Sequence, residues 1–185
     1  MKKAVYSFIY HRILGWQTNV TVPNFSKCVI CAAPHTTNFD LFLGKLFYGS
    51  LGRKASFMMK KEWFFFPLGI FFRAIGGIPV DRSKKTSLVE QMATRFISSQ
   101  EFHLAITPEG TRKANPEWKK GFYYIALKAN VPIVLIGIDY EKKIITATKY
   151  IIPSGNIKED MREIKMYFKD FKGKYPENFV LGDFE

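Results

Sequence analysis

Two residues near the start of the chain, His35 and Asp40, have the types and the spacing of an acid–base pair. They lie in CAAPHTTNFD, residues 31–40, where a short apolar run ends at Pro34. On a continuous helix, residues five apart are separated by about 500° and do not share a face. The two side chains therefore meet only if His35 precedes a helix and Asp40 reaches back from its second turn. The alternative is a turn histidine and a solvated aspartate.

If they meet, the carboxylate fixes the imidazole tautomer and leaves the second ring nitrogen free to accept a proton. The sequence contains no G-x-S-x-G motif to supply a serine nucleophile, which favours a hydroxyl of the substrate in that role. Cys28 and Cys31 fall in KCVICAAP, which has the pattern of a buried strand. Residues three apart in a strand point to opposite faces, so we expect two buried, inert thiols and no zinc site.

Two further segments supply groups that can bind an anion. In TPEGTRK, Gly110 lets the backbone approach a ligand, Thr111 offers a hydroxyl, and Arg112 can hold a phosphate through two bonds. Arg82, at the end of IPVDR, is a second candidate cation. Each arginine alone is more often a surface side chain with a solvated head. Together with the histidine, they indicate a phosphate held beside a hydroxyl that is to be deprotonated.

The run WFFFPLGIFF, residues 63–72, is the third unusual segment. Such runs usually form the core. Pro67 and Gly69, however, argue against a continuous helix through this one. An alternative is a wall for an acyl chain, which gains about 0.8 kcal/mol per buried methylene. The flanking basic residues would then lie at lipid headgroups: Lys60, Lys61 and Arg73.

Length and composition limit the class of protein. A chain of 185 residues, 47% hydrophobic and 24% charged, is typical of one folded domain, residues 1–185. Its net charge of +12 favours anionic partners. The basic residues are dispersed and no nucleic-acid motif is present, so we expect no nucleic-acid partner. Two thiols suit a reducing compartment.

The N-terminal segment MKKAVYSFIYHRILGW begins like a signal peptide, but His11 and Arg12 interrupt its apolar run. No stretch reaches the roughly 20 apolar residues that span a bilayer. Four apolar residues are predicted to share one helical face: Val5, Ile9, Ile13 and Trp16. Residues 1–20 therefore contain either a helix lying in a membrane interface or a helix packed on its own domain.

Strands and helices alternate along the chain. We expect strands at residues 27–34, 55–59, 102–106, 131–140 and 142–152, with a further strand in GGIPVDR. We expect helices after residues 36–37 and at residues 86–99, 119–130 and 157–171, the second of them opened by a Ser87–Glu90 capping box. This order predicts an α/β sandwich with a largely parallel central sheet, in which ligands gather where strands end and helices begin.

Four blocks in this order resemble the glycerolipid acyltransferase family typified by 1-acyl-sn-glycerol-3-phosphate acyltransferase. The blocks are HTTNFD, an H-x₄-D motif, then GGIPVDR, TPEGTR and VPIV, and the resemblance runs from about Cys31 to Tyr140. It implies that His35 is the general base, that Asp40 orients it, and that an acceptor hydroxyl attacks an acyl thioester of coenzyme A or acyl carrier protein. It implies no metal and no other cofactor.

The resemblance also assigns binding residues. The acceptor's phosphate and headgroup site would comprise Arg82, Glu109, Gly110, Thr111 and Arg112. The resemblance places Pro132 of VPIV in the acyl-chain region, to which the apolar run itself adds Trp63, Phe64, Phe65 and Phe66. Three departures from the family pattern lie beside the acceptor site: Pro34, Thr107 and Lys113.

The predicted function is acyl transfer to a lysophospholipid, first 1-acyl-glycerol-3-phosphate, by a peripheral protein on the cytoplasmic face of an anionic membrane. A lyso-aminolipid or another lysolipid is an alternative acceptor. A membrane-binding module without catalysis is the remaining alternative, and it leaves His35 and Asp40 unexplained.

Overall fold

The computed structural model describes residues 2–81 and 87–183, so the predicted cation Arg82 lies outside the described residues. The strands in these ranges are β1 (Gln17–Val20), β2 (Lys27–Ala33), β3 (Ser56–Lys60), β4 (Gly77–Val80), β5 (Phe102–Ile106), β6 (Ile133–Asp139) and β7 (Ile144–Ile151). The α-helices are α1 (Lys2–Ser7), α2 (Phe39–Ser50), α3 (Leu68–Ala74), α4 (Leu88–Ser98), α5 (Gly121–Ala129) and α6 (Ile157–Phe168). Shorter helical segments are η1 (Phe8–Ile13), η2 (Lys61–Trp63) and η3 (Pro176–Asn178).

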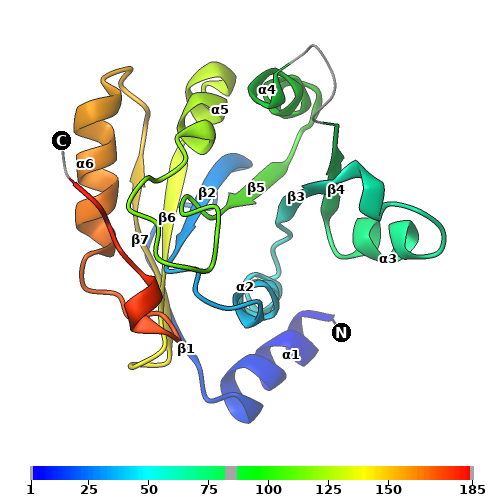
Figure 1. The fold of residues 1–185 in the computed structure, drawn as a ribbon. Helices are drawn as coiled ribbons and strands as arrows, with labels where there is room; N and C mark the ends of the chain where they lie inside the picture. Colours follow the sequence, from blue (N-terminus) through cyan, green and yellow to red (C-terminus); the bar gives the residue numbers. More distant parts are fainter. Residues whose placement is uncertain (1, 82–86, 184–185) are drawn as a thin grey trace.

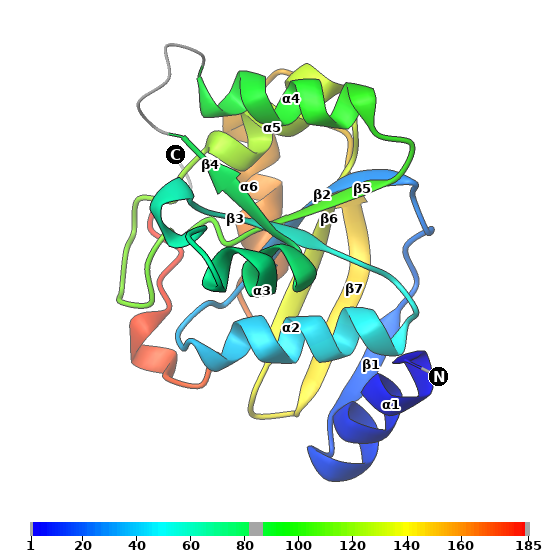
Figure 2. The ribbon, with the colours of Figure 1, turned by 90° about the vertical axis from the view of Figure 1, so that its right-hand side faces the viewer.

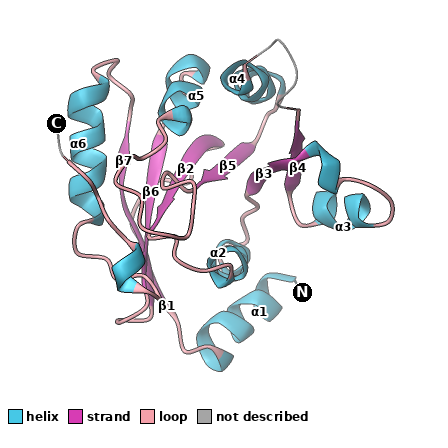
Figure 3. Ribbon diagram, in the orientation of Figure 1, coloured by secondary structure: helices cyan, strands magenta, loops and turns pink. Residues whose placement is uncertain are grey.

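The described strands form one sheet in the order β1-β7-β6-β2-β5-β3-β4 (Figures 1 and 3). Neighbouring strands are parallel except for the β6–β7 pair. This confirms the predicted α/β fold with a largely parallel central sheet. In the register of β2 with its neighbours, Cys31 lies opposite Ile106 of β5. The segments that follow β2 and β5, which contain HTTNFD and TPEGTR, therefore leave the same edge of the sheet side by side.

Helices cover both faces of the sheet (Figure 1). On one face, residues of α4, α5 and α6 pack against Val29, Leu104 and Ile133. On the other face, η1 and α2 pack against the sheet through Tyr10 and Phe47. Strands covered on both sides are apolar throughout, which explains why β2 and β6 have continuous hydrophobic sequences.

The cysteines separate onto these two faces, as the strand pattern predicts. Cys31 belongs to the core beneath α4, α5 and α6, and Cys28 belongs to the core beneath α2. Both are free and buried, and burial raises the pKa of both thiols, that of Cys28 to about 12. A thiol of raised pKa is a poor nucleophile near neutral pH.

The predicted helix signals are confirmed with small changes at the ends. Ser87 and the residue three positions later form a capping box, and the following helix, α4, begins at Leu88. Helix α5 ends before Asn130, which has the left-handed backbone (φ 52°) common at helix ends. Helix α6 ends at Phe168, three residues before the predicted end, and Phe171 then packs from the next loop against the core.

The apolar run 63–72 does not form one continuous helix, as expected from Pro67, but its second half lies in a helix. Helix α3 begins directly after Pro67, a position at which proline is tolerated because the first helical N–H groups have no intrahelical acceptor. Gly69 is buried, and a Cβ atom there would lie 2.5 Å from the carbonyl oxygen of Phe64. This glycine lets the helix lie close to the preceding loop instead of interrupting it.

The N-terminal prediction is wrong in one respect. Helix α1 continues as the π-helical segment η1, which ends at Ile13, and the chain turns at Gly15 (φ +69°). Trp16 therefore lies beyond the helix and is buried beside Tyr10, whereas Val5 and Ile13 are exposed. Strand β1, which follows, was not predicted because its four residues, QTNV, carry little apolar pattern.

Candidate active site

The histidine and the aspartate of the H-x₄-D motif are in contact. His35 follows the end of β2, Asp40 is the second residue of α2, and His35 Nδ1 lies 3.0 Å from Asp40 Oδ2. The backbone N–H groups of Thr36 and Thr37 each donate to the same carboxylate oxygen at 3.0 Å. The carboxylate thus fixes the loop and the ring together, and it does so from the first turn of the helix, not the second.

Tyr140, which follows β6, contacts the second oxygen of the same carboxylate. Its hydroxyl donates to Asp40 Oδ1 at 2.5 Å. Burial, with the hydrogen bond to Asp40 as the next cause, raises the pKa of the phenol, so Tyr140 stays a donor. Its ring lies edge-on to Trp16, with ring centroids 5.0 Å apart. No sequence pattern predicted this contact, because Tyr140 is 100 residues from Asp40 and belongs to no recognised motif.

Glu109 of the TPEGTR segment points inward to the histidine loop. Its Oε1 accepts the backbone N–H of His35 at 2.7 Å, and the residue is only 2% exposed. Its Oε2 has no hydrogen-bond partner among the described residues. Burial raises the pKa of this carboxyl to about 7, although the hydrogen bond from His35 lowers it. The prediction assigned Glu109 to the acceptor phosphate site. In the structure it contacts the backbone of His35.

A cavity of about 620 Å³ opens beside the pair, within the range of small-molecule sites. Its polar end includes His35, Asp40, Thr107, Gly110 and Arg112. Its apolar wall runs between α2 and the sheet: Ile30, Ala32, Phe47, Tyr48, Ala105, Ile136, Ile138 and Ile145. The cavity therefore joins a candidate base and a cation to a long apolar interior.

Among the described residues, three cations line this cavity: Lys45, Lys60 and Arg112. Arg112 and Lys60 are exposed. Lys45 is half-buried, and its ammonium group donates to the carbonyl oxygens of Ala55 and Ile75. Burial lowers the pKa of Lys45. Arg112 and Lys60 are thus the described cations that remain accessible to an anionic ligand entering the cavity.

The remaining predicted site residues lie elsewhere. Thr111 is next to the cavity residues Gly110 and Arg112 but does not line the cavity, and its hydroxyl accepts the backbone N–H of Lys113 at 3.3 Å. None of the predicted acyl-chain residues lines the cavity: Trp63, Phe64, Phe65, Phe66 and Pro132. Pro132 precedes β6, and its carbonyl accepts the N–H of Val29, so it lies toward the opposite edge of the sheet from His35.

Residues 2–81 and 87–183 contain no group of three or more His, Cys, Asp and Glu side chains that could hold a metal ion. No helix in the same part of the chain combines the length and the hydropathy needed to cross a membrane.

The structure is an α/β protein with an imidazole held by a carboxylate at the carboxyl edge of a largely parallel sheet. Beside this pair lies an apolar cavity with a cation at its polar end, an arrangement chemically capable of general base catalysis. A family model described as Acyltransferase matches residues 17–139, more than half of the chain, and the chain belongs to this family. The predicted family is thereby confirmed.

Two curated relatives are 1-acyl-sn-glycerol-3-phosphate acyltransferases, from Limnanthes alba and Limnanthes douglasii. Each is 32% identical to this chain over 109 residues. The match covers 56% of this chain and 36% of each relative, so it spans about a third of their length.

The fold is similar to that of the 1-acyl-sn-glycerophosphate (LPA) acyltransferase PlsC from Thermotoga maritima, a crystal structure, with a TM-score of 0.62. The superposition covers 90% of this chain and 76% of that chain at 16% sequence identity. At this identity the similarity concerns the fold, and it agrees with the predicted architecture.

Proposed function

We propose that this chain transfers a fatty acyl group from an acyl thioester to the free hydroxyl of a lysophospholipid. The contact between His35 and Asp40 at the polar end of an apolar cavity is the observation that carries the proposal. A base alone would fit many reactions. The cavity adds room for an acyl chain, and Arg112 adds a cation for a phosphate.

The reaction follows from the free ring nitrogen. With Nδ1 held by Asp40, Nε2 of His35 accepts the proton of the acceptor hydroxyl as its oxygen attacks the thioester carbonyl. The tetrahedral intermediate collapses, the carbon–sulfur bond breaks, and the thiolate takes the proton from the imidazolium. The products are the ester and the free thiol, and the neutral histidine is restored. Asp40 stabilises the imidazolium between the two steps.

The acceptor proposed first is 1-acyl-glycerol-3-phosphate, which gives phosphatidic acid. Both curated relatives carry that substrate in their names, and Arg112 supports phosphate recognition. Of the other residues predicted for the headgroup site, Gly110 lines the cavity, Thr111 lies next to it, Glu109 contacts the backbone of His35, and Arg82 lies outside the described residues. The donor is acyl-coenzyme A or acyl carrier protein, since a chain of net charge +12 attracts either anion. The lipid substrate and this charge also favour a peripheral position at the cytoplasmic membrane surface.

Replacing His35 with alanine tests the chemistry. We expect thiol release from acyl-coenzyme A in the presence of lysophosphatidic acid to fall by about 10²–10⁴-fold, the usual contribution of a general base. His11→Ala is the matched control, because His11 does not line the cavity and its ring contacts the backbone oxygen of Trp16. Turnover by the His35 variant within about threefold of the parent would refute the base assignment.

A panel of lysolipid acceptors tests the headgroup assignment. Thr107, one of the departures from the family pattern, lines the cavity together with Gly110. Because this departure lies in the cavity, the panel tests which acceptor headgroup the chain prefers. We expect higher turnover with a phosphate monoester than with a lyso-aminolipid, and we expect Arg112→Gln to remove that difference. Equal turnover of the parent protein with a neutral acceptor would contradict phosphate recognition. Vesicle binding without acyl transfer from either donor would instead favour the non-catalytic module.

A further inference from the structure

The segment from Trp63 to Phe71 forms an aromatic projection on the surface, outside the cavity. Six of its nine residues are exposed large apolar side chains: Trp63, Phe65, Phe66, Leu68, Ile70 and Phe71. Phe66 alone is 83% exposed. Together they expose on the order of 600 Å² of apolar surface, at the upper end of what monomeric proteins show. Scattered apolar residues are normal at a surface, but six exposed large apolar side chains within nine residues of the chain indicate an interaction site.

The exposure follows from how the segment packs. Gly69 faces the backbone of Phe64, and the rings of Phe64 and Phe72 pack edge to face with centroids 6.0 Å apart. The guanidinium of Arg73 lies over the Phe64 ring at 5.3 Å. These contacts fill the inner side of α3. The remaining apolar side chains must then point away from the protein, so the projection is a defined feature of the fold.

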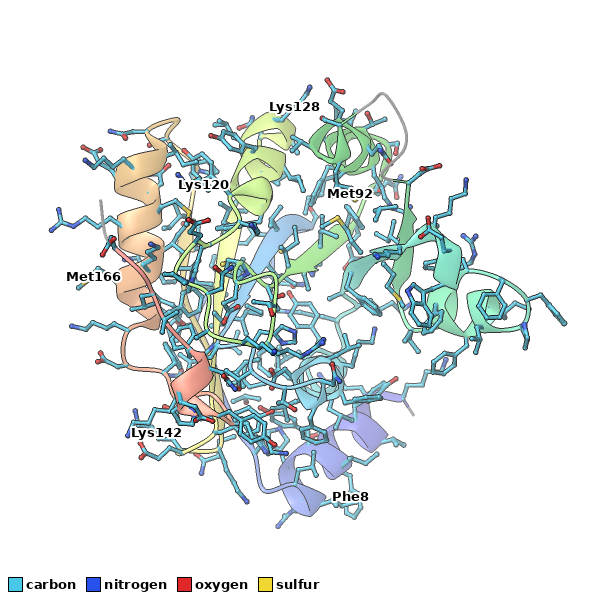
Figure 4. All side chains as sticks on the ribbon, in the orientation of Figure 1. Phe8, Met92, Lys120, Lys128, Lys142 and Met166 are labelled. Atoms are coloured by element: carbon cyan, nitrogen blue, oxygen red, sulfur yellow. The ribbon has the colours of Figure 1, made fainter. Side chains whose placement is uncertain are left out.

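The projection lies on the same side of the molecule as other exposed apolar residues. Figure 2 shows α1, α2 and α3 at the front of the ribbon. Phe42 of α2 is exposed and also lines the cavity, and Phe8 is exposed on the outer side of η1 (Figure 4). Several separate apolar side chains on one side of the molecule can each insert into a fluid lipid surface, which adapts its shape around them.

The net charge of the whole chain, more than the charge at the base of the projection, favours an anionic surface. Lys60, Lys61 and Arg73 are exposed there, and Lys60 also lines the cavity. Glu62 and Asp81 lie in the same region, and Lys61 pairs with Asp81 at 3.1 Å, so the local excess of positive charge is small. The chain as a whole carries +12, which attracts an anionic surface and repels a second copy of itself.

From these observations we infer that the aromatic projection inserts into one leaflet of an anionic bilayer and holds the cavity opening against the lipid surface. The choice of a lipid partner over a protein partner rests on the proposed function, since the substrates of that reaction are themselves lipids. Aromatic side chains favour the membrane interface, and neighbouring lysine and arginine side chains remain at the headgroups.

Trp63 provides an internal probe. It is 52% exposed, whereas Trp16 and Trp118 are each 5% exposed. We expect vesicles of phosphatidylcholine with phosphatidylglycerol to shift the tryptophan emission to shorter wavelength, and brominated lipids to quench it. Trp63→Phe should abolish both signals while the protein still sediments with the vesicles. Unchanged emission of the parent protein on addition of vesicles would overturn the proposal.

Two substitutions test the projection directly. The double variant Ile70→Ser/Phe71→Ser should lower the vesicle partition coefficient by about tenfold or more, because two apolar side chains no longer insert. Ile97→Ser is the matched control. Ile97 is an exposed apolar residue of α4, on the other face of the sheet, and its loss should leave partitioning unchanged. Equal partitioning of the double variant and the parent would refute insertion of α3.

Activity measurements separate this proposal from the proposed function. With short-chain, water-soluble substrates, the double variant should turn over within about threefold of the parent, whereas turnover of acceptor held in vesicles should fall with partitioning. Absence of turnover with both substrates, while vesicle binding still depends on the projection, would refute acyl transfer and leave the docking surface standing. A concentration-dependent dimer that the double variant loses, without vesicle binding, would assign the surface to a second copy instead.

Discussion

Glu109→Gln replaces a buried carboxyl group. Because burial raises the pKa of this group, we expect the replacement to change how the free energy of unfolding depends on pH. The side chain accepts the N–H of His35 at 2.7 Å, and its second oxygen has no partner in the described part of the chain. Burial is the main cause that raises the pKa from 4.5 to about 7. Glutamine keeps an oxygen to accept the same N–H but does not ionise.

The sign follows from proton binding. An acid whose pKa is higher in the folded state binds more protons when folded, so its contribution to stability is complete below the unfolded pKa and is lost as the pH rises through the folded pKa. For Glu109 this loss runs from about pH 4.5 to about pH 7. The pKa difference corresponds to roughly 3 kcal/mol, of which roughly 2–3 kcal/mol falls between about pH 5 and about pH 8.

The measurement is urea unfolding of the parent and the variant across that pH range. The glutamine NH₂ group would take the place of Oε2, which has no hydrogen-bond partner in the described part of the chain. We therefore expect the variant to have a lower free energy of unfolding than the parent at low pH. We therefore expect the difference in unfolding free energy, variant minus parent, to rise by roughly 2–3 kcal/mol with pH. Glu177→Gln is the matched control, because Glu177 is exposed and the same change there removes one charge without burial.

A difference that stays constant within about 0.5 kcal/mol over the range would refute the reasoning, since changes of that size are typical of surface positions. So would a Glu177 variant that shows the same rise as the Glu109 variant. The first result would mean that Glu109 ionises in the folded protein at ordinary cost, and the second that net charge, not burial, sets the pH dependence.

Three further predictions concern other parts of the chain. Tyr140→Phe removes the 2.5 Å hydrogen bond to Asp40 and should lower kcat about tenfold with little change in KM, because hydrogen bonds to charged groups contribute about 1.5–3 kcal/mol; unchanged kcat would exclude a positioning role. Ala105→Phe places a ring in the cavity wall and should shift donor preference toward shorter acyl chains by about ten- to hundredfold in kcat/KM, measured with a donor series, whereas an unchanged preference would place the acyl chain elsewhere. Ser87→Ala removes the N-cap of α4 and should cost about 1 kcal/mol of unfolding free energy with unaltered turnover, and a loss of activity would contradict a purely local role.

Local patterns in the sequence predicted the elements that depend on neighbouring residues. The continuous apolar runs of β2 and β6 predicted buried strands, and the capping box at Ser87 predicted the start of α4. Alternation along β2 placed the two cysteines on opposite faces. The H-x₄-D spacing also sufficed to propose the contact between His35 and Asp40, because the four residues that separate them restrict how the chain can turn.

The partners of that pair could not be predicted in this way. Tyr140 and Glu109 reach the motif from positions 100 and 74 residues away from their respective contacts. Only the order of the strands, with β2 between β5 and β6, brings the chain after each strand to one edge. Sequence patterns report whether a strand is buried, but not which strand lies beside it.

The aromatic run, residues 63–72, shows most clearly the difference between what local sequence predicts and what tertiary packing decides. Its composition predicted a role in burial or in acyl-chain binding, and ten apolar residues in a row gave no reason to expect exposure. The close contact of Gly69 with the backbone of Phe64 fixes which rings turn inward and which turn outward. By itself the sequence determined the alternation of strands and helices, the α/β class and the contact between His35 and Asp40, because these depend on the types and spacing of nearby residues. The cavity, the hydrogen bonds that support the pair and the exposed aromatic surface were decided by tertiary packing, which joins residues that no local pattern relates.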